Sequence, residues 1–227
     1  MMNKVLCSLL LFLSISCGLQ GRNANYARDS KRIWLDSKEI HHGEYVWKMK
    51  KAGDVISSAE KVSTLGYDTS DWLSAIVPGT VLNSLVYNKE YPEPYYGVNN
   101  KLESGKIPDI SKVGREFYTY WFRTEFDVPE SFAGKTIWLQ PDGVNYRAEI
   151  WVNGNLLSTL NGMFISDYIN VTDFVKVGRK NILAVKVYPV DVPGTTMPKS
   201  WGATGEFHNG GNGNIGLNTT MLMSVGS

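Results

Sequence analysis

The chain has 227 residues, of which 43% are hydrophobic and 12% aromatic, enough to bury one substantial core or two small ones. Twenty-three basic residues against 22 acidic ones leave a net charge of +1, and no basic run is long. Nucleic acids and anionic lipid surfaces are therefore not expected as partners.

The N-terminus has the pattern of an export signal. Lys4 precedes a mostly apolar stretch over residues 5–15, and the small residues Ser14 and Ser16 stand before Cys17. We assign residues 1–16 to a signal peptide and residues 17–30 to a polar tether. Cleavage before Cys17 would leave a lipidated cysteine, which we prefer, although the usual lipobox has Leu in place of Ser14. Free export is the alternative.

These features predict an exported bacterial protein, either periplasmic or a lipoprotein of the outer membrane or cell surface, that meets a membrane only through a lipid on Cys17. The chain has two cysteines, Cys7 and Cys17, so residues 18–227 contain none. An internal disulfide framework and thiolate metal sites are excluded there.

The remainder, residues 31–227, is read as one domain made mostly of short strands. Residues 44–49 alternate as an early strand, and Pro78-Gly79 requires a turn. Apolar residues then recur at helical spacing from Val81, which predicts one short helix ending near Asn88. Residues 91–100 form an aromatic and amide-rich loop that Pro92 and Pro94 keep irregular.

The strand signals are clearest from residue 118 onward. Residues 118–128 alternate so that one face is core and the other is at least partly wet. Residues 136–140, 144–152 and 181–188 supply further strands, and Asn153-Gly154 is a strong hairpin turn. Pro189 ends the last of them. Short strands at this spacing favour an all-β antiparallel sandwich.

Catalytic patterns are not visible. Hydrolysis by a carboxyl pair needs two facing carboxyl groups, about 5 to 5.5 Å apart in one arrangement or about 6.5 to 9.5 Å apart in another. The candidates Asp142, Glu149, Asp167 and Asp173 are each better explained as turn-formers or solvated strand residues. His41-His42 has no acidic neighbours at metal-ligand spacing. No cofactor or metal is expected, and whether calcium braces the Asn- and Gly-rich loop near His208 is left open.

Several segments in a fixed order resemble the N-terminal sugar-binding domain of glycoside hydrolase family 2. They are Tyr120 to Pro129, Asp142-Gly143-Val144, Ala148 to Gly154, Asn170-Val171-Thr172-Asp173 and Gly178 to Val185. Val77-Pro78-Gly79-Thr80-Val81 and Pro94-Tyr95-Tyr96-Gly97 are similar to the β-mannosidase and exo-β-glucosaminidase branch.

The resemblance implies a jelly-roll, galactose-binding-domain-like sandwich. In this family a later barrel domain supplies the glutamates for retaining hydrolysis of terminal β-linked sugars, so this chain is expected to be noncatalytic. Family members also carry a Trp-Asp element and a Gly-Ile-Trp strand entry near the domain's end. The sequence ends at Val225-Gly226-Ser227 without either, so the domain is expected to be incomplete at its C-terminus.

Carried over from the family, Asn99, Asn100 and Trp201 are the predicted substrate-binding residues. Tyr95 and Tyr96 could stack on sugar rings or pack against a following domain, and both interpretations stay open. The expected partners are carbohydrate and the barrel of a parent enzyme. A stand-alone, lectin-like surface module is the alternative function, and an adhesion or scaffold protein without sugar affinity is a third.

Overall fold

The computed structural model describes residues 32–40, 43–99, 104–108, 113, 115–162 and 165–189, and the backbone of residues 221–223. The chain divides into two units, Met1–Ile33 and Trp34–Ser227, and the fold below is that of the second. The predicted signal peptide and tether lie outside the described residues, as do Cys17, Asn100 and Trp201. No helix within the described ranges is both long and apolar enough to cross a bilayer.

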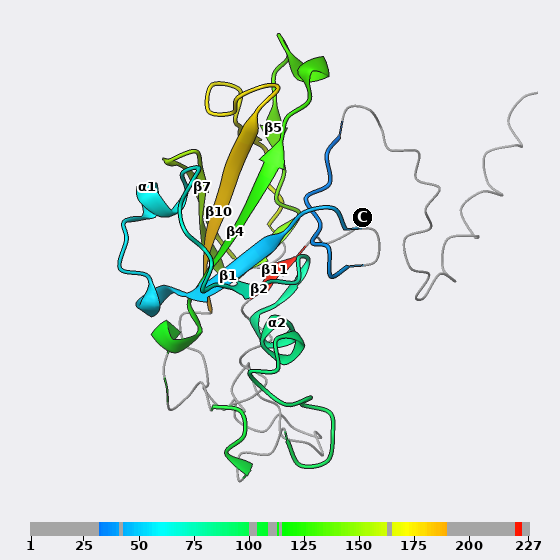
Figure 1. Ribbon diagram of the computed structural model, residues 1–227, viewed down its shortest axis with the longest axis vertical. Helices are drawn as coiled ribbons and strands as arrows, with labels where there is room; N and C mark the ends of the chain where they lie inside the picture. Colours follow the sequence, from blue (N-terminus) through cyan, green and yellow to red (C-terminus); the bar gives the residue numbers. More distant parts are fainter. Residues whose placement is uncertain are drawn as a thin grey trace, which may run out of the picture. The chain divides into compact units, whose positions relative to one another are not determined.

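One antiparallel sheet of six strands dominates the unit, in the order β2-β1-β4-β10-β7-β8 (Figure 1). Its strands are β1 (Trp47–Lys51), β2 (Leu73–Ser74), β4 (Tyr120–Asp127), β7 (Arg147–Val152), β8 (Asn155–Asn161) and β10 (Lys180–Tyr188). The long central pair β4 and β10 runs from Lys180↔Asp127 to Val187↔Tyr120 without a register shift. The strands predicted at residues 118–128 and 181–188 are confirmed.

Two smaller antiparallel sheets accompany it. One has the order β3-β11-β6, from β3 (Gly79–Thr80), β11 (Met221–Met223) and β6 (Gly143–Asn145); the other pairs β5 (Trp138–Leu139) with β9 (Ile169–Asn170). The strand predicted over residues 144–152 is in fact two strands, β6 and β7, that belong to different sheets. The sequence pattern does not predict β11, which joins segments far apart in the chain.

The main apolar core is built from the inner face of the large sheet together with α2 and the small sheets. Phe122, Ile150 and Val185 come from the large sheet, and Leu85 and Ile169 from α2 and β9. A core shared in this way, between antiparallel sheets, is the arrangement of a β-sandwich.

The predicted helix is α2 (Val81–Tyr87), with Asn88 as its C-cap. It begins where the Thr80 Oγ1 accepts a hydrogen bond from the Asn83 N–H at 2.9 Å, and it buries Val81, Leu82 and Leu85. A second helix, α1 (Ala59–Val62), is not predicted, because four residues are too few to show a period. Short 3-10 turns lie at η1 (Ala52–Asp54), η3 (Arg115–Tyr118) and η4 (Glu130–Phe132).

The Asn153-Gly154 hairpin is confirmed between β7 and β8, with φ of 48° and 90° at the two residues. The Asn153 side chain also joins the hairpin to β10. Its Nδ2 donates to the Asn181 Oδ1 at 2.8 Å, and its Oδ1 accepts from the Ile182 N–H at 2.9 Å. Asn181 is fully buried, so its hydrogen bonds replace those it would make to water.

The outer face of β4 is less exposed to solvent than the alternation of its residues predicts. Glu125 and Asp127 meet solvent, whereas Trp121 and Arg123 are buried. The segment around α1 covers them, because Val62, Trp72, Trp121, Trp151 and Ala184 form a second buried cluster there. The predicted wet face is therefore confined to one end of the strand.

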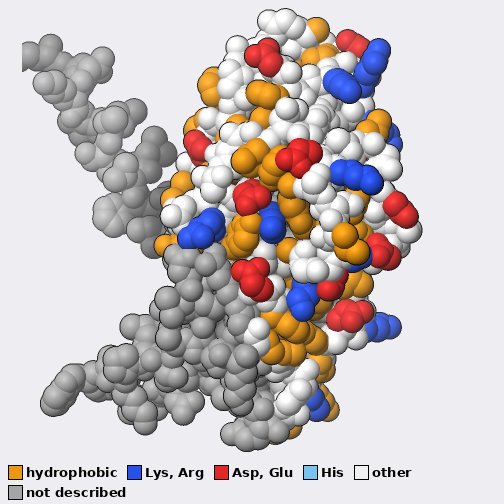
Figure 2. All heavy atoms as spheres, turned by 90° about the vertical axis from the view of Figure 1, so that its left-hand side faces the viewer, with side chains coloured by type: hydrophobic (Ala, Val, Ile, Leu, Met, Phe, Trp, Pro, Cys, Tyr) orange, Lys and Arg blue, Asp and Glu red, His pale blue; other side chains and the backbone are white. Residues whose placement is uncertain are grey.

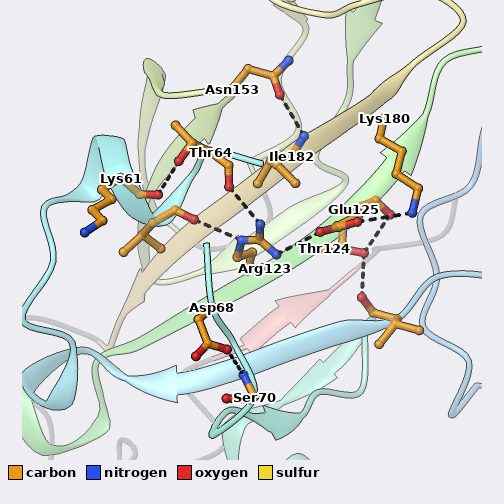
Figure 3. A network of polar contacts seen from close by, with 12 residues as sticks. Lys61, Thr64, Asp68, Ser70, Arg123, Thr124, Glu125, Asn153, Lys180 and Ile182 are labelled. Atoms are coloured by element: carbon orange, nitrogen blue, oxygen red, sulfur yellow. Dashed lines mark hydrogen bonds and ion pairs between the residues drawn. The ribbon is translucent and has the colours of Figure 1, made fainter. Parts of the chain in front are cut away.

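Arg123 fastens that covering segment to the sheet (Figure 3). Its Nε donates to the Val62 carbonyl and its Nη2 to the Thr64 carbonyl, each at 3.0 Å. Its Nη1 lies 3.7 Å from Glu125, whose other carboxylate oxygen is 3.5 Å from the Lys180 Nζ. Burial lowers the pKa of Arg123, and the Glu125 carboxylate opposes that shift.

Candidate functional site

The aromatic and amide-rich loop predicted after the helix is residues 88–99, here called the tyrosine loop. Asn88 fixes its start by clamping α2 to β2. The Asn88 Nδ2 donates to the Ser84 carbonyl at 2.6 Å and to the Ser74 carbonyl at 2.8 Å, and its Oδ1 accepts from the Ser74 N–H at 3.2 Å. The loop therefore leaves the sandwich from a rigid base.

Asn99 fixes the other end. Its side chain is only 6% exposed: the Nδ2 donates to the Glu93 carbonyl at 2.8 Å and the Oδ1 accepts from the Lys106 Nζ at 2.7 Å. The Asn99 carbonyl also accepts from the Ser104 Oγ at 3.2 Å. These contacts give Asn99 a loop-ordering role, and its role as a sugar contact stays a prediction. Asn100 and Trp201, the other two predicted sugar contacts, lie outside the described residues.

Between these two anchors the loop presents two aromatic rings to solvent. Tyr95 is 88% exposed and Tyr96 is 77% exposed. Their backbones are held by Glu93, whose Oε1 accepts from the Tyr95 N–H and whose carbonyl accepts from the Tyr96 N–H, each at 3.2 Å. An ordered loop with exposed tyrosines can stack on the apolar C–H faces of a sugar or on another apolar surface. The adjacent aromatic residues Tyr95 and Tyr96 are the sequence signal that made this loop a candidate sugar contact.

Below the loop, buried tyrosines join it to the core. The Tyr118 hydroxyl donates to the Pro108 carbonyl at 2.6 Å, and the Phe117 and Tyr118 rings meet edge to face at 4.8 Å. Burial raises the pKa of Tyr91, and a hydrogen bond with Tyr118 partly offsets the shift. Burial likewise raises the pKa of Tyr120 well above its usual range. The Tyr91 and Tyr120 hydroxyls are therefore protonated at neutral pH. Sequence reasoning missed this group.

A shallow depression of about 650 Å³ lies on the outer side of the sheet, beside the α1 segment. Asp54, Asp68 and Asp71 line it, with Lys50 and Tyr67. The Lys50 Nζ donates to the Asp71 carboxylate at 2.5 Å. The Ser70 N–H and hydroxyl lower the pKa of Asp68. A glycosidase's general acid needs a raised carboxyl pKa, so the environment of Asp68 is opposite to the one required.

Two of the other candidate carboxylates, Glu149 and Asp167, have structural contacts. Glu149 accepts hydrogen bonds from the Tyr188 hydroxyl at 2.6 Å and the Trp151 Nε1 at 3.3 Å, and Asp167 accepts from the Tyr168 N–H at 2.8 Å. Asp173 is exposed in a turn. Among the described residues, no group of three or more His, Cys, Asp or Glu is placed to hold a metal ion.

Charges of both signs are interspersed on the face that Figure 2 shows, so this face has no single-sign patch of the kind that recruits nucleic acid. The lining of the depression is also mixed, with Lys50 and Lys61 among its three aspartates.

Comparison with known proteins identifies the fold. The family described as "glycosyl hydrolase 2 galactose-binding domain-like" matches residues 47–205. The chain belongs to this family. The predicted class, an all-β antiparallel sandwich of the galactose-binding-like type, and the predicted relation to glycoside hydrolase family 2 are confirmed.

Two curated relatives illustrate the match. The chain is 40% identical over 131 residues to a mannosylglycoprotein endo-β-mannosidase of Lilium longiflorum, covering 58% of this chain and 13% of the relative. It is 29% identical over 149 residues to an exo-β-D-glucosaminidase of Amycolatopsis orientalis, covering 64% of this chain and 13% of the relative. The chain thus spans 13% of the length of either relative. Both lie in the branch that the motifs around Pro78 and Pro94 predict.

Solved structures of enzymes from the same family contain a domain of similar fold. The exo-chitosanase of Amycolatopsis orientalis, in a complex with PNP-β-D-glucosamine, superposes with a TM-score of 0.52 at 27% identity, over 65% of this chain and 16% of that one. Another structure, of the exo-β-D-glucosaminidase with an inhibitor, gives a TM-score of 0.57 at 23% identity over 79% of this chain and 19% of that one, a likeness of fold.

Proposed function

We propose that this chain is the sugar-facing N-terminal domain of an exported glycoside hydrolase that acts on terminal β-linked sugars. The observation that carries the proposal is the family match over residues 47–205, with relatives named as an endo-β-mannosidase and an exo-β-D-glucosaminidase. Under this proposal the substrate class is a β-linked mannoside or glucosaminide.

The proposed role of the chain is to shape a pocket and to support a barrel, while the barrel's glutamates perform retaining hydrolysis. The contacts of Asp71, Glu149 and Asp167 support a noncatalytic role, because each carboxylate already accepts a hydrogen bond from a structural neighbour. The apolar stretch before Cys17 supports export in a bacterium and attachment to a membrane through a lipid on that cysteine.

The tyrosine loop is the proposed sugar-facing element. Glu93 and Asn99 hold its backbone, so the Tyr95 and Tyr96 rings can bind without the cost of ordering a flexible loop. Their exposure also supports the second candidate function, a stand-alone carbohydrate-binding module at the cell surface. The two functions share this site and differ in whether a catalytic barrel accompanies it.

A binding and turnover experiment on the full chain tests the proposal. We expect no release of nitrophenol from aryl β-mannoside, β-glucosaminide or β-galactoside, and weak binding of β-mannan or chitosan oligosaccharides by calorimetry. The double variant Tyr95→Ala/Tyr96→Ala should weaken that binding at least about tenfold, because each ring removed takes away its stacking contact. Ile56→Ala, at an exposed apolar residue of the outer depression, is the matched control.

Turnover abolished by changing one carboxylate of this chain would refute the noncatalytic role. Sequencing the gene beyond codon 227 separates the two functions: a barrel-coding frame supports the hydrolase, and an immediate stop with no such frame supports the stand-alone module. Unchanged oligosaccharide affinity in the double variant would show that the tyrosine loop is not the sugar-binding element in either function.

A further inference from the structure

The outward side of the β5–β9 pair carries an uncharged, partly aromatic surface that the proposed function does not use. It consists of Trp138, Gln140, Ser166, Tyr168 and Asn170, here called the β5–β9 platform. Trp138 is 53% exposed and Tyr168 is 62% exposed, and the other three side chains are also exposed.

The strand register explains why these residues share one side. Leu139 pairs with Ile169, and both side chains pack toward the main core. Trp138 pairs with Asn170 one step along and must point the other way, because successive side chains alternate across a strand. Gln140 and Tyr168 lie one step beyond the Leu139↔Ile169 pair, on that same outward side. The Gln140 Nε2 donates to the Ser166 Oγ at 3.5 Å, which links the two segments further.

The platform is framed by rigid backbone. The Val171 N–H donates to the Ile137 carbonyl at 2.9 Å, and the Ile137 N–H donates to the Thr172 Oγ1 at 2.9 Å. The Asn170 Oδ1 accepts from the Thr172 N–H at 3.0 Å and from its hydroxyl at 2.7 Å. These contacts fix the strand ends, so the aromatic side chains stand on an ordered base.

The polar atoms of the platform point to the ligand class. Within the described residues the Trp138 Nε1, the Asn170 Nδ2, the Gln140 Oε1 and the Tyr168 hydroxyl make no hydrogen bond. Two donors, one acceptor and one group that can do both therefore surround two exposed rings. Apolar ring faces bordered by such groups match a neutral sugar, whose C–H faces stack and whose hydroxyls both donate and accept.

Charge distinguishes this surface from the outer side of the six-stranded sheet. The outer side of the six-stranded sheet carries the Lys50–Asp71 pair and the Arg123, Glu125 and Lys180 group. None of the five platform residues is charged. A charged polysaccharide or a charged protein surface would find no partner on it, whereas an uncharged glycan loses no ion hydration when it binds there.

Spacing favours a chain over a single sugar. Trp138 and Tyr168 are diagonal neighbours across the strand pair, a relation in which residues are about 7 to 8 Å apart. Two rings so placed can contact different units of one oligosaccharide. Figure 1 draws β5 near the upper end of β4, and α2, which leads into the tyrosine loop, beside its lower end, so the platform is separate from that loop.

We propose that the β5–β9 platform is an accessory binding site for a neutral β-linked oligosaccharide, distinct from the tyrosine loop. It extends the proposed carbohydrate role and rests on it for the class of ligand. The site would hold a glycan chain at a second point, away from the end sugar that the tyrosine loop faces.

Calorimetry on the full chain tests the site with uncharged β-linked hexasaccharides of mannose, glucose, galactose and N-acetylglucosamine, each beside its disaccharide. We expect at least one hexasaccharide to bind at least about tenfold more tightly than its disaccharide, and Trp138→Ala to lower its affinity at least about tenfold. Trp138→Phe should retain part of the affinity because it keeps a ring. Leu156→Ala, which truncates an exposed residue of edge strand β8, is the control and should have no effect.

The tyrosine-loop double variant Tyr95→Ala/Tyr96→Ala separates this inference from the proposed function. Hexasaccharide binding kept in that variant and lost in Trp138→Ala supports the platform, even if the tyrosine loop binds nothing. The inference is overturned by no binding to any of the four hexasaccharides, by unchanged affinity in Trp138→Ala with normal circular dichroism, or by a self-associated chain that Trp138→Ala makes monomeric.

Discussion

The two faces of the central strand β4 are both largely buried, but different parts of the chain bury them. On the inner side Phe122 lies in the main apolar core, which is shared with α2 and the small sheets. On the outer side Arg123 lies beneath the α1 segment and bonds to two backbone carbonyls. The inner face is thus held by apolar packing, and the outer face depends strongly on a few directed hydrogen bonds. Substitutions on the two faces should therefore have different effects on the free energy of unfolding.

The largest effect is expected on the inner face. Phe122→Ala removes a fully buried ring from the middle of the sheet and leaves a cavity, so the free energy of unfolding should fall by about 3–5 kcal/mol. Urea unfolding followed by circular dichroism measures the change. A loss below about 1 kcal/mol would mean that the inner core is not packed as described.

A smaller effect is expected on the outer face. Arg123→Ala leaves the Val62 and Thr64 carbonyls without their donor, so the free energy of unfolding should fall by about 2–3 kcal/mol. Amide exchange of residues 59–64 should quicken more than that of β10, because only the covering segment loses its anchor.

Lys180→Ala is the matched control for Arg123→Ala. It removes an exposed cation from the same Glu125 carboxylate and should cost less than about 1 kcal/mol. Equal losses in the two variants would show that the outer face is held by surface charge and not by the two carbonyl contacts.

Alkaline pH should weaken the inner face. Burial raises the pKa of Tyr120 above its unfolded value, so the folded chain keeps a proton that the unfolded chain releases. The contribution of Tyr120 to the free energy of unfolding is constant below about pH 10, where the residue is protonated in both states. Above that pH it declines by about 1.4 kcal/mol per pH unit, until Tyr120 ionises in the folded chain as well. Tyr120→Phe should flatten the decline in urea unfolding measured between pH 9 and pH 11.

Tyr95→Phe, which removes a hydroxyl from an exposed ring, is the control for the alkaline decline. If the free energy of unfolding of Tyr120→Phe fell with pH as steeply as that of the unsubstituted chain, the decline would have to come from other groups. Tyr91 is the next to test, because burial raises its pKa in the same direction.

Local sequence signals were sufficient to predict several elements of the fold. The Asn153-Gly154 turn was predictable because only a few residue types tolerate positive φ at both positions. The helix after Thr80 was predictable from the helical spacing of its apolar residues. The exposed tyrosine loop was also marked in advance, since Pro92 and Pro94 exclude regular structure there.

The candidate sites were harder to predict. Asn99 has the residue type of a sugar contact, yet its hydrogen bonds are made within the loop, which only the folded backbone could show. The platform depends on the pairing of two-residue strands 31 positions apart, too short for a period to be visible. The contacts of Arg123 join residues about 60 positions apart in sequence, which no local pattern records.

The sequence by itself determined the antiparallel β class, the main strands and hairpin, and the kinship with sugar-binding domains, because these follow from side-chain alternation, turn chemistry and short motifs. Only the tertiary structure decided what covers each face of the sheet, which amides are committed to internal hydrogen bonds, and which aromatic rings remain exposed. Those outcomes depend on contacts between segments distant in the chain, and burial is a property of such contacts and not of any one residue.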